Sequence, residues 1–137
     1  MFHRYNLFAY GTLQIPEVMA AVAGTGFASE RASIKDHARY RLSELSYPGL
    51  RREAGAEAHG ILYRELDAGA MARLDVFEDD FYRRETHTVI TDTGEAVEAE
   101  VYVVPPEHDS LLIPEPWDLE RFRTQDLPRF LGRCRSP

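Results

Sequence analysis

The chain has 137 residues, of which 44% are hydrophobic and 28% are charged; this indicates one soluble globular domain and excludes a disordered, collagen-like or membrane-bundle protein. The net charge of −7 is concentrated in residues 53–109, where 4 basic and 15 acidic side chains give −11, and this acidic stretch disfavours nucleic acid as a partner. With one lysine (Lys35) and one cysteine (Cys134), we expect neither lysine chemistry nor an internal disulfide, and we expect a cytoplasmic protein with no signal peptide and no membrane partner.

The N-terminal half predicts short strands around one helix. Residues 5–10 are aromatic and apolar and predict a buried strand, which Gly11 ends. A helix is expected to begin at Pro16, a favoured first helical position. Residues 27–34 and 38–43 predict two more strands, and Ser46-Tyr47-Pro48-Gly49 predicts a turn after them.

The C-terminal half predicts two helices and a hairpin. Residues 57–66 read as a strand in which His59-Gly60 marks a close backbone approach, and Asp67 can cap a helix over 68–79. Residues 85–91 and 96–104 form the clearest hairpin, in which valines alternate with polar residues and Tyr102 lies on the face opposite them. A last helix over about 117–133 is expected to break or kink at Pro128.

Because strands outnumber helices and a hairpin is present, the predicted class is α+β, with a compact mixed β-barrel-like sheet and flanking helices. We expect a single domain over 1–137, with a core of about 5–104 and a Pro-rich segment and helix over 105–137.

Two segments are candidates for chemistry. Tyr10-Gly11-Thr12-Leu13 follows a buried strand, so its backbone N–H groups can bind a carboxylate or an oxyanion; the alternative is a plain strand-to-helix turn. Glu78 borders an apolar helix face, which raises the pKa of a carboxyl group, and Asp79 and Asp80 act in the same direction. Such a glutamate can take and give a proton near neutral pH; the alternative is a solvated acidic helix end.

Other kinds of site find no support in the sequence. The five histidines are scattered without metal-ligand spacing, and no nucleophile elbow, P-loop or dinucleotide fingerprint is present. Cys134 has no histidine motif near it and is expected to be inert.

The chain contains six short motifs in this order: Tyr10-Gly11-Thr12-Leu13, Tyr47-Pro48-Gly49-Leu50, Gly60-Ile61-Leu62-Tyr63, Leu74-Asp75-x-Phe77-Glu78, Tyr82-x-Arg84 and Val101-Tyr102-Val103. Together these motifs resemble the gamma-glutamylcyclotransferase-like superfamily, including its avirulence-induced and gamma-glutamylamine cyclotransferase branches. The resemblance covers roughly residues 5–104.

The resemblance implies a cofactor-independent enzyme, a transferase or lyase that cyclises a small gamma-glutamyl compound. The products are 5-oxoproline and an amine or amino acid. By motif, Glu78 matches the catalytic glutamate, Tyr10 and the 11–13 loop match the substrate-binding backbone, and Tyr82 and Tyr102 match pocket positions. No metal or cofactor is implied, and we expect a monomer or homodimer.

Asp79 departs from the family pattern, which has glycine after the glutamate. Its charge disfavours a strongly anionic substrate and favours a gamma-glutamyl amine. Two alternatives stay open: a non-catalytic module of the same fold that binds a small carboxylate, and a cyclotransferase that acts on another aminoacyl group.

Overall fold

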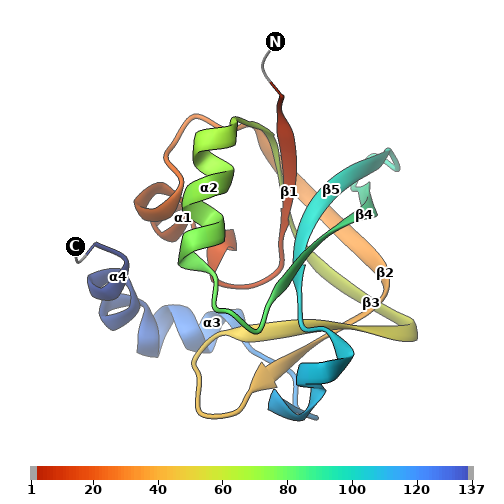
Figure 1. The fold of residues 1–137 in the computed structure, drawn as a ribbon, viewed down its shortest axis with the longest axis vertical. Helices are drawn as coiled ribbons and strands as arrows, with labels where there is room; N and C mark the ends of the chain where they lie inside the picture. Colours follow the sequence, from red (N-terminus) through yellow and green to blue (C-terminus); the bar gives the residue numbers. More distant parts are fainter. Residues whose placement is uncertain (1–2, 136–137) are drawn as a thin grey trace.

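Five strands close into a mixed β-barrel, and a sixth short strand extends the sheet (Figure 1). The computed structural model describes residues 3–135. The strands are β1 (Tyr5–Ala9), β2 (Ser29–Leu42), β3 (Pro48–Leu66), β4 (Arg83–Thr91), β5 (Ala96–Val103) and β6 (Leu112–Ile113). Their order is β3-β1-β5-β4-β2-β6, and pairing of β3 with β2 closes the ring. Only the β1–β5 pair is parallel within this described sheet, so the α+β prediction of a barrel-like mixed sheet is confirmed.

The two strands expected over 27–34 and 38–43 form the single strand β2, which is a correction to the sequence analysis. A bulge between Lys35 and His37 bends this strand without ending it, and Asp36 lies there with φ 59°. The Asp36 carboxylate accepts a hydrogen bond of 3.0 Å from the backbone N–H of Gly55 in β3, which supports the bend from the neighbouring strand. The expected turn is also shorter than predicted, because Pro48 already begins β3. Proline is tolerated at a first strand position, where its missing N–H matters least.

Gly60 lies where β3 passes very close to β1. A Cβ atom at this position would lie 2.2 Å from the carbonyl oxygen of Ala9, so only glycine fits without moving the backbone. The close approach expected at His59-Gly60 is therefore confirmed.

The barrel wall separates two apolar layers. Alternate residues of β5, among them Val101 and Val103, pack inside the barrel with Phe8 of β1. Tyr102 faces the other side with Leu7, as the alternation predicted. The helices on that outer side cover the second layer, which extends to Phe130 near the C-terminus (Figure 1).

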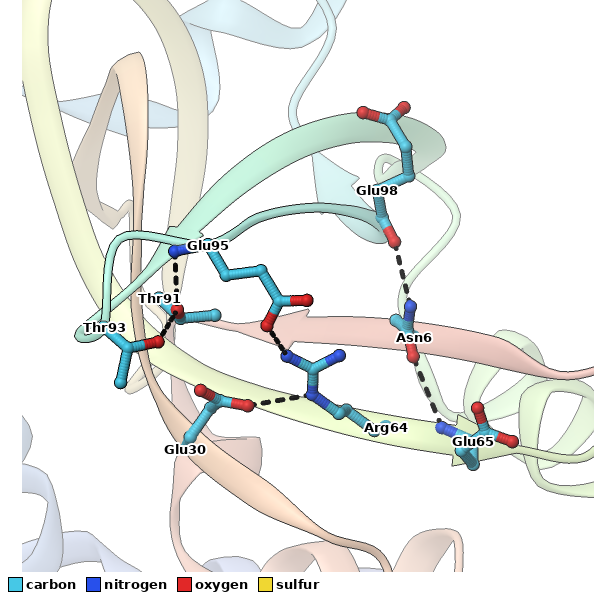
Figure 2. Close-up of polar contacts among 8 residues, drawn as sticks. All are labelled: Asn6, Glu30, Arg64, Glu65, Thr91, Thr93, Glu95 and Glu98. Atoms are coloured by element: carbon cyan, nitrogen blue, oxygen red, sulfur yellow. Dashed lines mark hydrogen bonds and ion pairs between the residues drawn. The ribbon is translucent and has the colours of Figure 1, made fainter.

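Polar side chains brace the strands where β1 pairs irregularly (Figure 2). The side-chain amide of Asn6 donates to the carbonyl oxygen of Glu98 at 3.2 Å and accepts from the N–H of Glu65 at 3.3 Å, which links β5 to β3 across β1. The guanidinium of Arg64 donates to Glu30 and Glu95 at 2.8 and 2.7 Å and so joins β3 to β2 and to the β4–β5 connection (Figure 2).

The first two α-helices begin where the sequence indicated, at Pro16 and Ala68, and the last helical segment begins at Leu119 instead of about residue 117. The α-helices are α1 (Pro16–Val22), α2 (Ala68–Phe77), α3 (Leu119–Arg121) and α4 (Leu127–Arg135), and 3₁₀ turns occupy Thr12–Gln14 and Pro106–Leu111. Asp67 caps α2 by accepting from the N–H of Ala70 at 2.8 Å. A π-helical turn over Phe122–Asp126 precedes Pro128, so the expected irregularity lies just before the proline. None of the helices in residues 3–135 has the length and apolar character needed to cross a bilayer.

Candidate active site

A cavity opens between the end of β1, the C-terminal end of α2 and the start of β4. Its empty volume is about 600 Å³, part of it open to solvent. All seven residues that the sequence analysis proposed for a site line it: Tyr10, Gly11, Thr12, Leu13, Glu78, Tyr82 and Tyr102. The fold thus brings three distant segments of the chain to one concave surface, the usual setting of a small-molecule site.

Glu78 is the first residue beyond α2, which ends at Phe77, two residues earlier than predicted. Its backbone is extended, with φ −72° and ψ 143°, and its N–H still donates to the carbonyl of Leu74 at 3.0 Å. Among the side chains and backbone groups that the structure describes, none donates a hydrogen bond to the Glu78 carboxylate. The described groups therefore leave this carboxylate open to a ligand at the edge of the cavity.

Burial raises the pKa of Glu78 to about 8 from an ordinary value of 4.5, and the carboxylates of Asp79 and Asp75 add smaller repulsive contributions. Asp80, to which we had assigned part of this effect, is exposed, and Asp75 takes its place as the second like charge. Asp75 lies in the last turn of α2, three residues before Glu78, whose N–H still bonds to the helix. A carboxyl group with this pKa exchanges protons readily at neutral pH.

The loop after β1 presents unpaired backbone donors. The N–H groups of Gly11, Thr12 and Leu13 donate to no acceptor in the part of the chain that the structure describes. The carbonyls of Gly11 and Thr12, in contrast, accept from the N–H groups of Gln14 and Ile15 at 3.1 and 3.0 Å. Successive unpaired N–H groups beside a cavity suit a carboxylate or an oxyanion.

Gly11 also lacks a side chain for a steric reason. A Cβ atom there would lie 2.9 Å from Cγ of Pro48, which lines the same cavity. The glycine therefore lets the loop approach the start of β3 and keeps this side of the cavity open.

The tyrosine hydroxyls around the cavity are engaged within the protein. Tyr82 donates to the carbonyl oxygen of Pro48 at 2.6 Å, and Tyr102 donates to the carboxylate of Asp75 at 2.7 Å. Burial raises the pKa of both hydroxyls well above the ordinary value of 10, so they remain protonated. These residues shape the wall and hold neighbouring segments, and they are poor candidates for a general base.

The charged side chains among the described lining residues are all acidic. Glu78 and Asp79 contribute carboxylates, and no lysine, arginine or histidine is among the described residues that line the cavity. Arg84, whose role the sequence left open, lies outside the lining with its Nε 3.6 Å from Asp75 and 3.7 Å from Glu100. Among the described groups, the backbone N–H groups of the 11–13 loop are therefore well suited to bind an anion in this cavity.

Sequence reasoning missed three aromatic contributors to the wall: Phe130, Tyr47 and Phe77. Phe130 reaches the cavity from α4, and its ring lies 6.0 Å from that of Tyr47 and 5.9 Å from that of Phe77, edge-on to both. No local signal in the sequence connects residue 130 with residues 47 and 77. Residues 105–117 do not line the cavity, so the Pro-rich segment acts as a connector.

The possible metal ligands and the histidines are not brought together at the cavity in this way. Among residues 3–135, no three His, Cys, Asp or Glu side chains are arranged to hold a metal ion. His37 and His87 meet with ring centroids 4.8 Å apart, away from the cavity lining.

The chain is similar in sequence to known proteins. Residues 7–119 match the model of the family described as "Gamma-glutamyl cyclotransferase, AIG2-like". AIG2-like protein C of Arabidopsis thaliana is 32% identical over 128 residues, covering 93% of this chain and 74% of that protein.

Solved structures share the fold. A solution structure from Arabidopsis thaliana superposes with a TM-score of 0.74 at 27% identity, covering 97% of this chain and 81% of that one. A structure described as a gamma-glutamyl cyclotransferase gives a TM-score of 0.67 at 14% identity, covering 98% and 88%, and this likeness concerns the fold alone. The family match spans most of the barrel and the three site segments at residues 10–13, 78–82 and 102, and the chain belongs to the AIG2-like gamma-glutamyl cyclotransferase family.

Proposed function

We propose that the protein is a gamma-glutamylcyclotransferase that converts a gamma-glutamyl compound into 5-oxoproline and a free amine or amino acid. The observation that carries the proposal is the Glu78 carboxylate, which has no hydrogen-bond partner among the groups that the structure describes and a pKa raised to about 8. It borders the same cavity as the unpaired N–H groups of the 11–13 loop. Family membership supports the same reaction class.

The reaction joins two ends of one substrate. Glu78 removes a proton from the substrate α-ammonium, and the freed nitrogen attacks the γ-carbonyl carbon. A carbon–nitrogen bond forms to close the five-membered ring, and the bond from that carbon to the leaving nitrogen breaks. Two protons pass in total from the α-nitrogen to the leaving nitrogen, with Glu78 carrying each in turn, so that no water, oxidant or reductant is consumed.

The loop N–H groups stabilise the negative parts of the substrate. They can hold the α-carboxylate in the bound substrate or the oxyanion that develops at the γ-carbonyl. Because the described lining contains no basic side chain, these backbone donors are the groups suited to that task. Asp79 adds a negative charge to the wall, which favours a gamma-glutamyl amine over a gamma-glutamyl amino acid with its second carboxylate.

The test is to measure 5-oxoproline release by the purified protein and by the variant Glu78→Gln. The substrates are a gamma-glutamyl alkylamide and a gamma-glutamyl amino acid. We expect the alkylamide to react faster, and the variant to lose about 10²–10⁴-fold in rate because glutamine cannot transfer the proton. Asp80→Asn removes a neighbouring exposed carboxylate and should leave the rate unchanged.

Undiminished turnover by Glu78→Gln would refute the assignment of Glu78. If the unmodified protein binds 5-oxoproline tightly but releases none from either substrate, the non-catalytic binding module is favoured. If only another aminoacyl compound is cyclised, the chemistry stands and the gamma-glutamyl specificity is wrong.

A further inference from the structure

The positively charged side chain of Arg39 contacts the loop of residues 10–13 but does not line the cavity. Arg39 extends from β2, and its Nη1 donates to the carbonyl oxygen of Tyr10 at 2.8 Å and to that of His59 at 3.3 Å. Its guanidinium carbon is 5.6 Å from the ring centroid of Trp117. The side chain is partly buried, so this contact is screened less by solvent than a surface contact is.

Two other side chains, those of Gln14 and Tyr63, also donate hydrogen bonds to carbonyl oxygens of this loop. Nε2 of Gln14 donates to the carbonyl oxygens of Tyr10 at 2.9 Å and of Gly11 at 3.2 Å. The hydroxyl of Tyr63 in β3 donates to the carbonyl oxygen of Leu13 at 2.7 Å. The loop carbonyls are thus bound by protein donors while the N–H groups of residues 11–13 stay unpaired in the described chain.

The geometry of the peptide group connects these two facts. In a trans peptide, the carbonyl of one residue and the N–H of the next point in opposite directions, and residues 3–135 contain no cis peptide. The bond from Arg39 to the Tyr10 carbonyl therefore fixes the direction of the Gly11 N–H. A charged donor on the carbonyl also polarises the peptide and makes that N–H a stronger donor.

From this arrangement we infer that Arg39 is a positioning residue that orients and polarises the Tyr10–Gly11 peptide so that the loop binds the α-carboxylate shared by gamma-glutamyl substrates and 5-oxoproline. The inference rests on the proposed function, because it takes the loop as the substrate site. It explains how a cavity whose described lining has carboxylates but no basic side chain accepts a carboxylate: the positive charge acts through one peptide group.

A purely structural role predicts something different. If Arg39 only ties β2 to the Trp117 segment, its removal lowers stability and affects every ligand of the cavity alike. If it positions the loop, its removal weakens ligands that carry the carboxylate and spares a ligand that lacks it.

The experiment compares two cavity ligands by titration calorimetry: 5-oxoproline and 2-pyrrolidinone, the same lactam without its carboxylate. For Arg39→Met we expect the affinity for 5-oxoproline to fall about tenfold or more, while the affinity for 2-pyrrolidinone changes less than about twofold. Arg39→Lys keeps the charge and should recover part of the loss. The matched control is Arg41→Met on the same strand, which removes a surface ion pair with Glu115 and should alter neither affinity.

Turnover gives a second readout. Because the carboxylate is bound in substrate and transition state alike, Arg39→Met should raise KM and change kcat little. If Arg39→Met does not fold, Gln14→Leu removes the second donor to the same carbonyl and carries the same selective prediction.

An equal loss for both lactams, or an unchanged affinity for 5-oxoproline, overturns the inference. The two proposals fail separately. A protein that releases 5-oxoproline from substrate while Arg39→Met binds it normally retains the proposed function and loses this inference. A protein that neither forms nor binds 5-oxoproline loses both.

Discussion

Replacing Glu78 by glutamine should stabilise the folded protein while it lowers turnover by about 10²–10⁴-fold. Burial and two like charges disfavour the ionised carboxylate in the folded state, where its pKa is about 8 against an ordinary 4.5. Between these pH values the unfolded chain has released this proton and the folded chain still holds it. The free energy of unfolding therefore falls as pH rises from about 4.5 to about 8, and a glutamine at this position escapes that fall.

The size of the effect follows from the two pKa values. A difference of 3.5 between about 8 and 4.5 corresponds to about 4.8 kcal/mol at high pH, of which about 3.5 kcal/mol develops between about pH 5 and 8. Solvent reaches the carboxylate through the cavity, so we expect the stability advantage of Glu78→Gln to grow by about 1–2 kcal/mol over this interval.

Urea denaturation of both proteins at pH 5 and pH 8 measures this growth, because titrating groups that do not interact with residue 78 cancel in the difference. Asp80→Asn serves as the control and should show a constant difference from the unmodified protein. A Glu78→Gln advantage that is constant with pH to within about 0.5 kcal/mol, or that shrinks as pH rises, would refute the account of a desolvated carboxylate.

Three further changes have clear outcomes. Asp79→Asn removes a like charge beside Glu78 and so should lower the pKa of Glu78, which moves the acidic limb of the pH–rate profile to lower pH. Asp80→Asn should leave that limb in place. An unmoved limb in both variants contradicts the electrostatic assignment. Gly60→Ala places a Cβ atom 2.2 Å from a carbonyl oxygen of β1 and should lower the free energy of unfolding, measured by urea denaturation, by about 3 kcal/mol or more. The control is Gly69→Ala in α2, where the Cβ meets only ordinary contacts, and it should be neutral or stabilising by about 0.5–1 kcal/mol. Equal effects of the two substitutions would be inconsistent with the close approach. Phe130→Ala deletes a ring that is 6% exposed and should lower the free energy of unfolding by about 3 kcal/mol, and a loss below about 1 kcal/mol would mean that α4 packs only loosely on the domain.

Features that depend on neighbouring residues were predictable from the sequence. The Asp67 cap needs only the N–H three residues ahead, and the β4–β5 hairpin needs a turn and alternating side chains. Glu78 and the 10–13 loop were found as separate motifs, and the family pattern joined them before the fold placed them in one cavity.

Features that depend on distant partners were not predictable in the same way. The bulge at Asp36 bends a strand, instead of ending it, because Gly55 on β3 donates to its side chain. Asp75, and not Asp80, contributes to the raised pKa of Glu78. Asp80 lies exposed beyond the end of α2 at Phe77, and a hydrophobic pattern does not locate a helix end to within two residues.

The position of β1 has a consequence for how the chain acquires its shape during synthesis. Leu7 pairs with Tyr63 on one side and with Glu100 on the other, so the strand that is made early waits for partners about 55 and 90 residues later. Helices α1 and α2 have 7 and 10 residues, too few for a stable isolated helix, and their apolar faces pack in the same core layer as β1. The loop that follows β1 therefore takes its final place only after β5 has been made, and the cavity is among the last parts of the domain to assemble.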